Sequence, residues 1–216
     1  MTTHARFTAW AARVAALALG AALLGGCASG PHANPADPFE PYNRGMTTFN
    51  DNVDKAVLKP VATLYRDATP QPLRTGVGNF FANLGDAWSF VNNLLQLRPL
   101  EAYDSMVRFS VNSVLGLGGV LDIASEMGVE RHRQDFGLTL GRWGVPTGPY
   151  LVLPLLGPST VRDTAALPVD YMVGDLVDHV HDVPVRNSLY GLRFIDKRAQ
   201  LLGATTVLDE AALDSY

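Results

Sequence analysis

Cysteine is almost absent from this sequence of 216 residues, which contains Cys27 and no other cysteine. A lone cysteine cannot form an internal disulfide, so a disulfide-stabilised fold is excluded. Clustered positive charge is absent as well, and the formal net charge is −4 at pH 7. An acidic chain without a cluster of Lys and Arg lacks the electrostatic footprint of a nucleic-acid-binding protein, so we expect no nucleic-acid partner.

Apolar runs that could form a transmembrane helix are also lacking. The run at residues 14–24 is too short, because a helix needs about 20 residues to cross a bilayer. Residues 143–161 carry no charge, but they contain four prolines. Each interior proline removes a helical hydrogen bond and costs about 3 kcal/mol. We therefore expect residues 150–156 to form an extended apolar segment that packs against helices or lines a passage.

The start of the chain is typical of an export signal. Arg6 and Arg13 precede the apolar run, and Gly25 and Gly26 lie directly before Cys27. This arrangement resembles a bacterial lipobox, so we expect residues 1–26 to be a signal peptide and Cys27 to be lipid-modified. Removing the signal takes away two arginines and no acidic residue, which changes the net charge from −4 to −6. Residues 27–36 are predicted to be a lipidated tether, and residues 37–216 one helical domain.

The most regular helical pattern begins after Pro72. Its apolar residues recur at steps of three and four, which places them on one face of a helix. They are Val77, Phe80, Phe81, Leu84, Trp88, Val91, Leu94 and Leu95. The opposite face carries neutral polar groups instead of the Lys and Glu pairs of an ordinary solvated face. These are Asn79, Asn83, Ser89, Asn92, Asn93 and Gln96.

A second apolar segment follows Arg98 and Pro99 and is expected to end at Gly128. Residues 109–121 contain no charge, and the glycines at 116, 118 and 119 permit close approach of two backbones. We expect the two segments to form a helical hairpin in or beside lipid. A buried hairpin in a soluble helical bundle is the alternative.

Further helices are predicted on both sides of this hairpin. One helix begins near Asp37 and ends before Pro60, because proline disfavours helical geometry in the residue ahead of it. Another is interrupted at Pro168, and a third runs from Pro184 to Gly203, followed by a short helix at residues 208–213. No convincing strand pairs are found. The predicted fold class is therefore all-α, a single bundle of amphipathic helices with an irregular Pro/Gly-rich apolar segment.

Motifs for enzymatic or nucleotide chemistry are missing from the sequence. The Gly-x-Ser-x-Gly elbow and the Walker A loop are absent, and Gly76-Val77-Gly78 lacks a third glycine. His179 and His181 could bind a metal together, but a stable site needs further ligands, so a solvated turn is the preferred interpretation. We expect no catalytic residue, no cofactor and no metal.

Several motifs, in this order along the chain, resemble the VacJ/MlaA family of outer-membrane lipoproteins. They are residues 37–44 (DPFEPYNR), 70–74 (PQPLR), 108–113 (RFSVNS) with the glycines of 116–119, 135–141 (DFGLTLG), 148–150 (GPY), 157–158 (GP) and 162–163 (RD). The resemblance covers residue 37 to about residue 202. Family members usually continue past the position of Tyr216 into a further helix and tail, so a short variant and an incomplete sequence are both open.

The resemblance implies a disc- or ring-like helical domain, embedded in the periplasmic leaflet of the outer membrane, with an amphipathic channel. It implies that such a protein removes mislocalised phospholipid from the outer leaflet and passes it to a periplasmic lipid carrier of the MlaC type. Family members are often held against a trimeric outer-membrane porin. This role maintains lipid asymmetry and needs no enzymatic step.

A protein that moves phospholipid needs an apolar rim for the tails and a separate polar path for the head group. We predict that six apolar residues lie in the core or on the lipid-facing rim: Val77, Phe80, Phe81, Leu84, Trp88 and Val91. Asn92, Asn93 and Gln96 are predicted to border the polar path, and Gly116, Gly118 and Gly119 to form a flexible constriction. Two rivals are a scaffold lipoprotein that does not handle lipid and a lipid hydrolase, and neither has a motif in its favour.

Overall fold

The computed structural model describes residues 37–211, and side-chain environments up to residue 204. The predicted signal peptide, Cys27 and the tether lie outside the described residues. In chain order the elements are α2 (Glu40–Val53), η1 (Asp54–Leu58), α3 (Lys59–Ala68), α4 (Gln71–Leu95), α5 (Pro99–Val114), α6 (Ile123–Glu126), α7 (Phe136–Arg142), β1 (Tyr150–Leu153), β2 (Gly157–Thr160), α8 (Val161–Val169), η2 (Asp170–Gly174) and α9 (Val183–Ala211).

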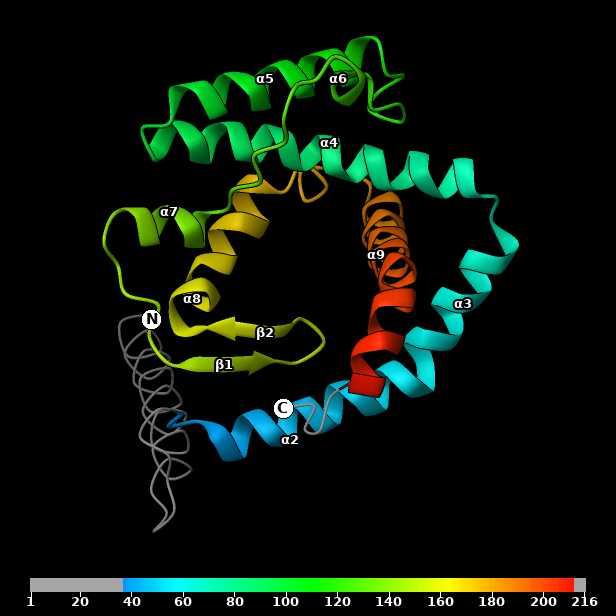
Figure 1. Cartoon of the computed structure of the whole chain (residues 1–216), viewed down its shortest axis with the longest axis vertical. Helices are drawn as coiled ribbons and strands as arrows, with labels where there is room; N and C mark the ends of the chain where they lie inside the picture. Colours follow the sequence, from blue (N-terminus) through cyan, green and yellow to red (C-terminus); the bar gives the residue numbers. More distant parts are fainter. Residues whose placement is uncertain (1–36, 212–216) are drawn as a thin grey trace, which may run out of the picture.

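The elements are arranged as a ring (Figure 1). α2 and α3 form one side, α4 forms the next, and α7, α8 and the β-hairpin complete the circuit. α5 packs along the outside of α4, and α9 packs against α3 and α4. The prediction of a predominantly helical, ring-like domain is therefore confirmed.

The buried interior of the ring wall is polar, and most of its large apolar side chains are not fully buried. The buried apolar residues are small or few: Ala62, Ala102, Ala124, Val152, Ala166, Val177, Ala199 and Leu202. The buried polar residues are Asn43, Asn83, Asp86, Ser89, Asn92, Asn93, Gln96, Ser105, Arg108, Asn112, Thr139 and Asp196. A water-soluble domain normally shows the opposite distribution. This inversion fits a protein whose outer surface faces an apolar medium.

Arg108 of α5 is the centre of the buried polar interface between α4, α5 and α6. Its guanidinium donates to Asp122 Oδ1 at 2.8 Å and to Asp86 Oδ2 at 3.3 Å, and only 1% of the side chain is exposed. Asn112 donates to the same Asp122 and accepts from the Ala124 amide. Burial of an arginine is tolerated when its donors and charge are matched in this way.

Two prolines do not end helices where the sequence pattern predicts it. Pro60 lies in the first turn of α3, which continues from α2 through the π-helical turn η1, so the predicted end before Pro60 is wrong. Pro168 lies inside α8, which continues into a second π-helical turn, η2. Because the backbone stays helical through η1, Pro60 lies within one continuous helix, and each of the two prolines lies next to a π-helical turn. Single π turns alter the local hydrogen-bond register, and they are frequent at functional sites.

Two other predicted helix ends also need correction. The second central segment does not remain helical to Gly128, because α5 ends at Val114 and Leu117, Gly118 and Gly119 have φ values of 54°, 73° and 98°. Such left-handed backbone cannot continue an α-helix. At the other end of the chain, Gly203 does not stop α9, which runs to Ala211 and includes most of the predicted last short helix.

The Pro/Gly-rich segment forms an antiparallel hairpin of β1 and β2, a strand pair that the sequence pattern did not predict. The register pairs Tyr150 with Thr160 and Leu153 with Gly157. Leu155 and Gly157 have φ values of 63° and 81° in and beside the turn. The predicted extended conformation is confirmed over Tyr150–Leu153.

Two asparagines of α2 bind the free edge of β1 and close the ring. Asn43 accepts from the Val152 amide at 2.8 Å and donates to the Tyr150 carbonyl at 3.1 Å. Asn50 accepts from the Leu155 amide at 2.8 Å and donates to the Leu153 carbonyl at 2.9 Å. Each amide side chain thus donates and accepts the two hydrogen bonds that the backbone of a neighbouring strand would otherwise provide.

Candidate functional site

A cavity of about 1060 Å³ lies inside the ring. Its wall comes from α2, η1, α3, α4, the hairpin turn, η2 and α9, so segments from both ends of the domain meet around it. Its apolar residues are Leu58, Phe81, Leu84, Trp88, Leu155, Leu156, Tyr171, Leu176, Tyr190, Phe194 and Leu201. Its charged residues are Asp51, Asp54, Lys55, Lys59, Asp135, Asp170, Asp175, Arg193, Lys197 and Arg198. The cavity is therefore amphipathic.

Both arginines of the cavity wall are held by carboxylates in two-pronged pairs. Arg193 donates to Asp175 Oδ1 at 3.1 Å and to Oδ2 at 2.6 Å, and its guanidinium carbon lies 4.9 Å from the Tyr190 ring centre. Arg198 donates to Asp54 at 2.6 and 2.8 Å. These pairs fix α9 to η1 and to the segment after η2. Burial, and then the Asp175 charge, raises the pKa of Tyr190 to about 12, so its hydroxyl stays neutral at physiological pH.

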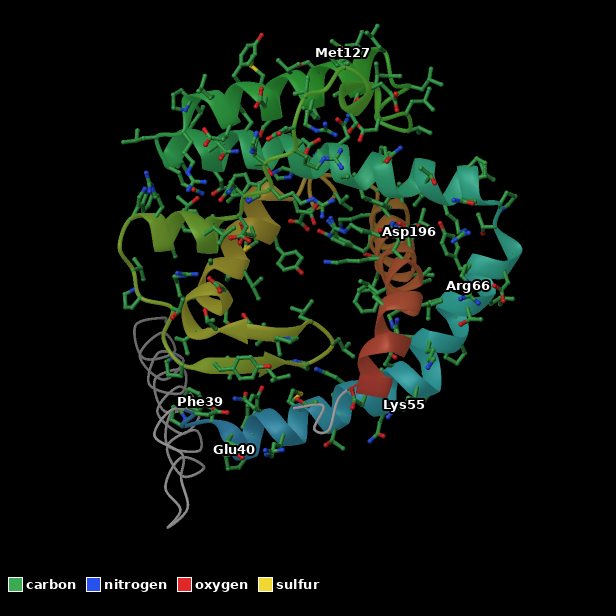
Figure 2. All side chains as sticks on the ribbon, viewed as in Figure 1. Phe39, Glu40, Lys55, Arg66, Met127 and Asp196 are labelled. Carbon is green, nitrogen blue, oxygen red and sulfur yellow. The ribbon has the colours of Figure 1, made fainter. Side chains whose placement is uncertain are left out.

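The three lysines of the wall differ from the arginines. Among the residues that the structure describes, Lys55, Lys59 and Lys197 have no ion-pair partner, and all three are exposed. Figure 2 labels Lys55 where η1 lies near α9. An ammonium group without a fixed partner is available to an anionic group of a bound molecule.

Trp88 is fixed against the other side of the cavity. Its indole N–H donates to Asp170 Oδ1 at 2.7 Å, and the same oxygen accepts from the Phe136 amide at 2.8 Å. Burial raises the pKa of Asp170 above the usual value. A side chain at Gly174 would lie 2.3 Å from the Trp88 ring, so only glycine permits this close packing of η2 on α4.

The predicted apolar site residues of α4 divide into two groups. Phe81, Leu84 and Trp88 line the central cavity. Val77, Phe80 and Val91 are not among its lining residues. Val91 is exposed on the outside, whereas Phe80 packs edge-to-face on Phe81 with ring centres 5.2 Å apart.

The amides predicted to border a polar path are not among the lining residues of the central cavity. Asn92 accepts from the Thr139 hydroxyl at 2.7 Å, and Gln96 donates to the same hydroxyl at 3.0 Å. Asn93 donates to Ser105. All three amides are buried in the interface of α4 with α5 and α7, because polar groups on those helices match them.

The predicted glycine constriction is not part of the cavity wall either. Gly116, Gly118 and Gly119 lie in the turn after α5, on the outer side of α4. A side chain at Gly119 would lie 2.7 Å from the Asn83 amide, and one at Gly116 would lie 2.2 Å from the Leu121 carbonyl oxygen. These two glycines allow the turn to pack tightly.

The cavity-lining residues that were not predicted from the sequence come mainly from α9 and from η1. On α9 the cavity residues are Tyr190, Arg193, Phe194, Lys197, Arg198 and Leu201. They recur at steps of three and four, a pattern that marks one helix face and was visible in the sequence. Lys55 and Lys197 are far apart in the chain, and no sequence signal joins them.

The described residues were compared with the requirements for a metal site and for a membrane-spanning helix. His179 and His181 are exposed, and residues 37–211 contain no group of three or more potential metal ligands. Within the same range no helix has both the length and the apolar character that a bilayer crossing requires.

Comparison with known proteins gives consistent matches along nearly the whole chain. The family profile described as "MlaA lipoprotein" matches residues 35–216. The "Intermembrane phospholipid transport system lipoprotein MlaA" of Escherichia coli (strain K12) is 38% identical over 216 residues, covering 94% of this chain and 82% of that protein. The protein of the same name from Haemophilus influenzae is 34% identical over 209 residues, covering 89% of this chain and 80% of that protein.

A solved structure has the same architecture. It is described as "Structural basis for maintenance of bacterial outer membrane lipid asymmetry", and it matches with a TM-score of 0.71 and 35% sequence identity. The match covers 82% of this chain and 90% of that chain. Sequence and fold therefore give the same assignment.

Proposed function

This chain belongs to the MlaA lipoprotein family, and from that premise we propose that it carries phospholipid through its central cavity. Its relatives are named as lipoproteins of an intermembrane phospholipid transport system, so it is an envelope lipoprotein that acts on lipid. The role proposed for it is removal of mislocalised phospholipid from the outer leaflet of the outer membrane, which maintains lipid asymmetry.

One observation carries this proposal: the central cavity combines an apolar wall with a charged wall that includes three lysines without an ion-pair partner among the described residues, in one space of about 1060 Å³. Acyl chains would lie against Phe81, Leu84 and Phe194, because apolar chains are driven out of water. The phosphate of the head group would pair with Lys55, Lys59 or Lys197, which have no ion-pair partner among the described residues. A phospholipid requires both environments at once.

The location of the protein and its partners are part of the same proposal. We place the protein at the periplasmic leaflet of the outer membrane, anchored through a lipidated Cys27. The phospholipid would pass to a periplasmic carrier of the MlaC type, and a trimeric porin would hold the protein in place. No nucleotide-binding motif supplies energy, and no enzymatic step is proposed.

The experiment that tests the proposal obstructs the cavity without disturbing the fold. Gly85 lines the cavity, and a Cβ added at this position would meet nothing within 4 Å, so the side chain of Gly85→Phe starts from an open position on the cavity wall. Gly45→Phe is the matched control, because Gly45 is also in a helix with nothing within 4 Å but does not line the cavity. We expect Gly85→Phe to reduce phospholipid transfer from proteoliposomes to a soluble acceptor to the protein-free background.

The same preparations separate the rival functions. Mass spectrometry of the detergent-purified mature protein should find bound phospholipid in wild type and in Gly45→Phe, and less in Gly85→Phe. A scaffold lipoprotein would carry no phospholipid in any variant. A lipid hydrolase would release free fatty acid. Equal transfer by Gly85→Phe and Gly45→Phe would refute passage through the cavity.

A further inference from the structure

A second cavity, of about 350 Å³, lies between α4, α9 and the loop after α6. It shares no lining residue with the central cavity. On α9 it is lined by Asp196, Ala199 and Gln200, which lie on a different helix face from the residues of the central cavity. α9 therefore separates two independent spaces, and the proposed lipid passage does not use the second one.

Positive charge gathers in this second cavity although the chain as a whole is acidic. Arg74, Arg131 and Arg133 all line it, and Asp196 is the one carboxylate among its lining residues. Asp196 already accepts from the Tyr65 hydroxyl at 3.0 Å and from the Gln200 amide at 2.7 Å. Arg131 is balanced by Asp86 and Asp122 behind the lining, so the charges of Arg74 and Arg133 face one carboxylate whose hydrogen bonds are provided elsewhere.

Two of the three guanidinium groups, those of Arg74 and Arg133, retain unused donors. Among the described residues, Arg74 makes one hydrogen bond, from Nε to the Thr69 carbonyl, and the exposed Arg133 has no ion-pair partner. Arg131 is already paired, because its Nε lies 3.1 Å from Asp86 Oδ1 and its Nη2 lies 3.5 Å from Asp122 Oδ2. The unused donors are therefore those of Arg74 and Arg133, and an anion in the cavity would accept from them.

The rest of the wall suits an oxyanion. Gln71 begins α4, so the positive end of the helix dipole lies at this cavity, and Thr75 adds a neutral hydroxyl donor. Gly78 lets α9 approach closely, because a side chain there would lie 2.8 Å from Gln200 Nε2. A volume of about 350 Å³ falls within the range of about 300–1,000 Å³ usual for small-molecule sites.

We propose that this second cavity binds a phosphate group through Arg74, Arg131 and Arg133. Guanidinium forks match phosphate oxygens in geometry as well as in charge, which makes arginine the preferred residue for this chemistry. The phosphate has two sources, inorganic phosphate or the phosphodiester of a lipid head group. Either one would accept from the unused donors of Arg74 and Arg133, with the charge of Arg131 beside them.

The test measures phosphate binding by the whole mature protein in a phosphate-free detergent, by ³¹P NMR line broadening and calorimetry with inorganic phosphate. Arg131 is kept, because it pairs with the buried Asp86. Arg133→Gln, an exposed change that leaves the fold intact, should weaken binding about tenfold, and Arg74→Gln with Arg133→Gln about 100-fold, which corresponds to about 1.4 kcal/mol for each lost charge-assisted interaction. Arg66→Gln on the neighbouring α3, where Arg66 is exposed and pairs with Asp67, should leave binding unchanged.

Two results overturn the proposal: no phosphate binding by wild type, or binding that survives in the double variant. Loss of binding in Lys197→Gln, which alters only the central cavity, would also overturn it, because the phosphate would then belong to the first cavity. Competition by sn-glycero-3-phosphoglycerol identifies a head-group site, and its absence identifies a free-phosphate site. The phosphate-binding experiment does not measure lipid transfer. A failure of the transport proposal would therefore appear only in the transfer assay with Gly85→Phe.

Discussion

Arg108 shows how single residues stabilise a fold whose buried interior is polar. It is almost fully buried, and its charge is balanced by Asp86, also buried, and by Asp122 at the edge of the interface. Asn112 and Ser125 complete the acceptors and donors around it. A buried pair of this kind contributes little beyond an apolar replacement, but breaking it leaves an unbalanced charge inside the protein.

Arg108→Met should therefore lower the free energy of unfolding by about 3–5 kcal/mol, because it removes the charge partner that Asp86 and Asp122 share and leaves Arg131 alone to balance both carboxylates. The measurement is guanidinium unfolding followed by tryptophan fluorescence. Arg66→Met is the control, since the exposed Arg66–Asp67 pair should contribute less than about 1 kcal/mol. Equal stability of the two variants would contradict the assigned role of Arg108.

The charge of Asp122 makes part of this stability depend on pH. Burial opposes ionisation, but hydrogen bonds from Ser125 and Asn112 and the Arg108 charge outweigh it and lower the pKa of Asp122 to about 2. The unfolded value is about 3.9, so the folded state favours the charged form. This stabilisation is present above about pH 4 and is lost as the pH falls through about 2.

We expect the stability difference between wild type and Asp122→Asn to be constant above about pH 4.5 and to shrink below it. Thermal unfolding of both proteins at steps from pH 5 to pH 2 would measure this difference. A gap that widens as the pH falls would show that the sign of the Asp122 shift is wrong.

At the scale of elements, the ring depends on contacts between segments that are distant in sequence. The free edge of β1 is capped by the amide side chains of Asn43 and Asn50, which are separated from it by about 100 residues. Arg198 joins α9 to η1, and Arg193 joins it to the segment after η2. Each join is made of directional polar groups, because the ring lacks a large apolar core that could hold it.

Asn43→Ala should cost about 1–3 kcal/mol, because Asn43 is fully buried and the Val152 amide loses its acceptor. Hydrogen exchange should then accelerate at Val152, and Asn50→Ala should accelerate exchange at Leu155 instead. Asn52→Ala, on the exposed side of the same helix, is the control and should change neither. Exchange that is equally fast in all three variants would show that the asparagines do not hold the strand.

In the molecule as a whole, the side chains buried within the ring wall are mostly polar, and many large apolar side chains are exposed on its surface. Four of the most exposed large apolar side chains lie on or beside α5: Leu97, Leu100, Val114 and Leu117, with exposed fractions of 87%, 77%, 78% and 73%. An apolar surface of this extent on a monomer marks a membrane or protein interaction site. The proposed position in one leaflet of a bilayer would remove this surface from water.

Replacing these four residues by Ser should weaken binding to vesicles by more than tenfold, since each buried side chain contributes about 1.5–3 kcal/mol. The measurement is vesicle flotation in a Cys27→Ser background, which removes the predicted anchor. A variant with Thr48→Ser and Asn52→Ser, two exposed polar positions on α2, is the control. Unchanged flotation of the fourfold variant would show that this surface does not contact lipid.

The sequence alone determined the helical character, the length of α4 and its two chemically different faces, because the periodicity of apolar and amide residues is a local property. It also determined the extended Tyr150–Leu153 segment through its prolines and apolar residues. The family motifs predicted the ring. The strand pairing and the π turns were not predicted, since both depend on hydrogen bonds to residues elsewhere in the fold.

Only the tertiary structure decided which face of α4 points where. Asn92, Asn93 and Gln96 face the interfaces of α4 with α5 and α7 because Ser105 and Thr139 offer them partners there, and a helix pattern contains no information about those partners. The central cavity likewise has both Lys55 and Lys197 in its wall, and these two residues share one space only when the ring closes. A helix face is determined locally, but its burial is determined by the surface that packs against it.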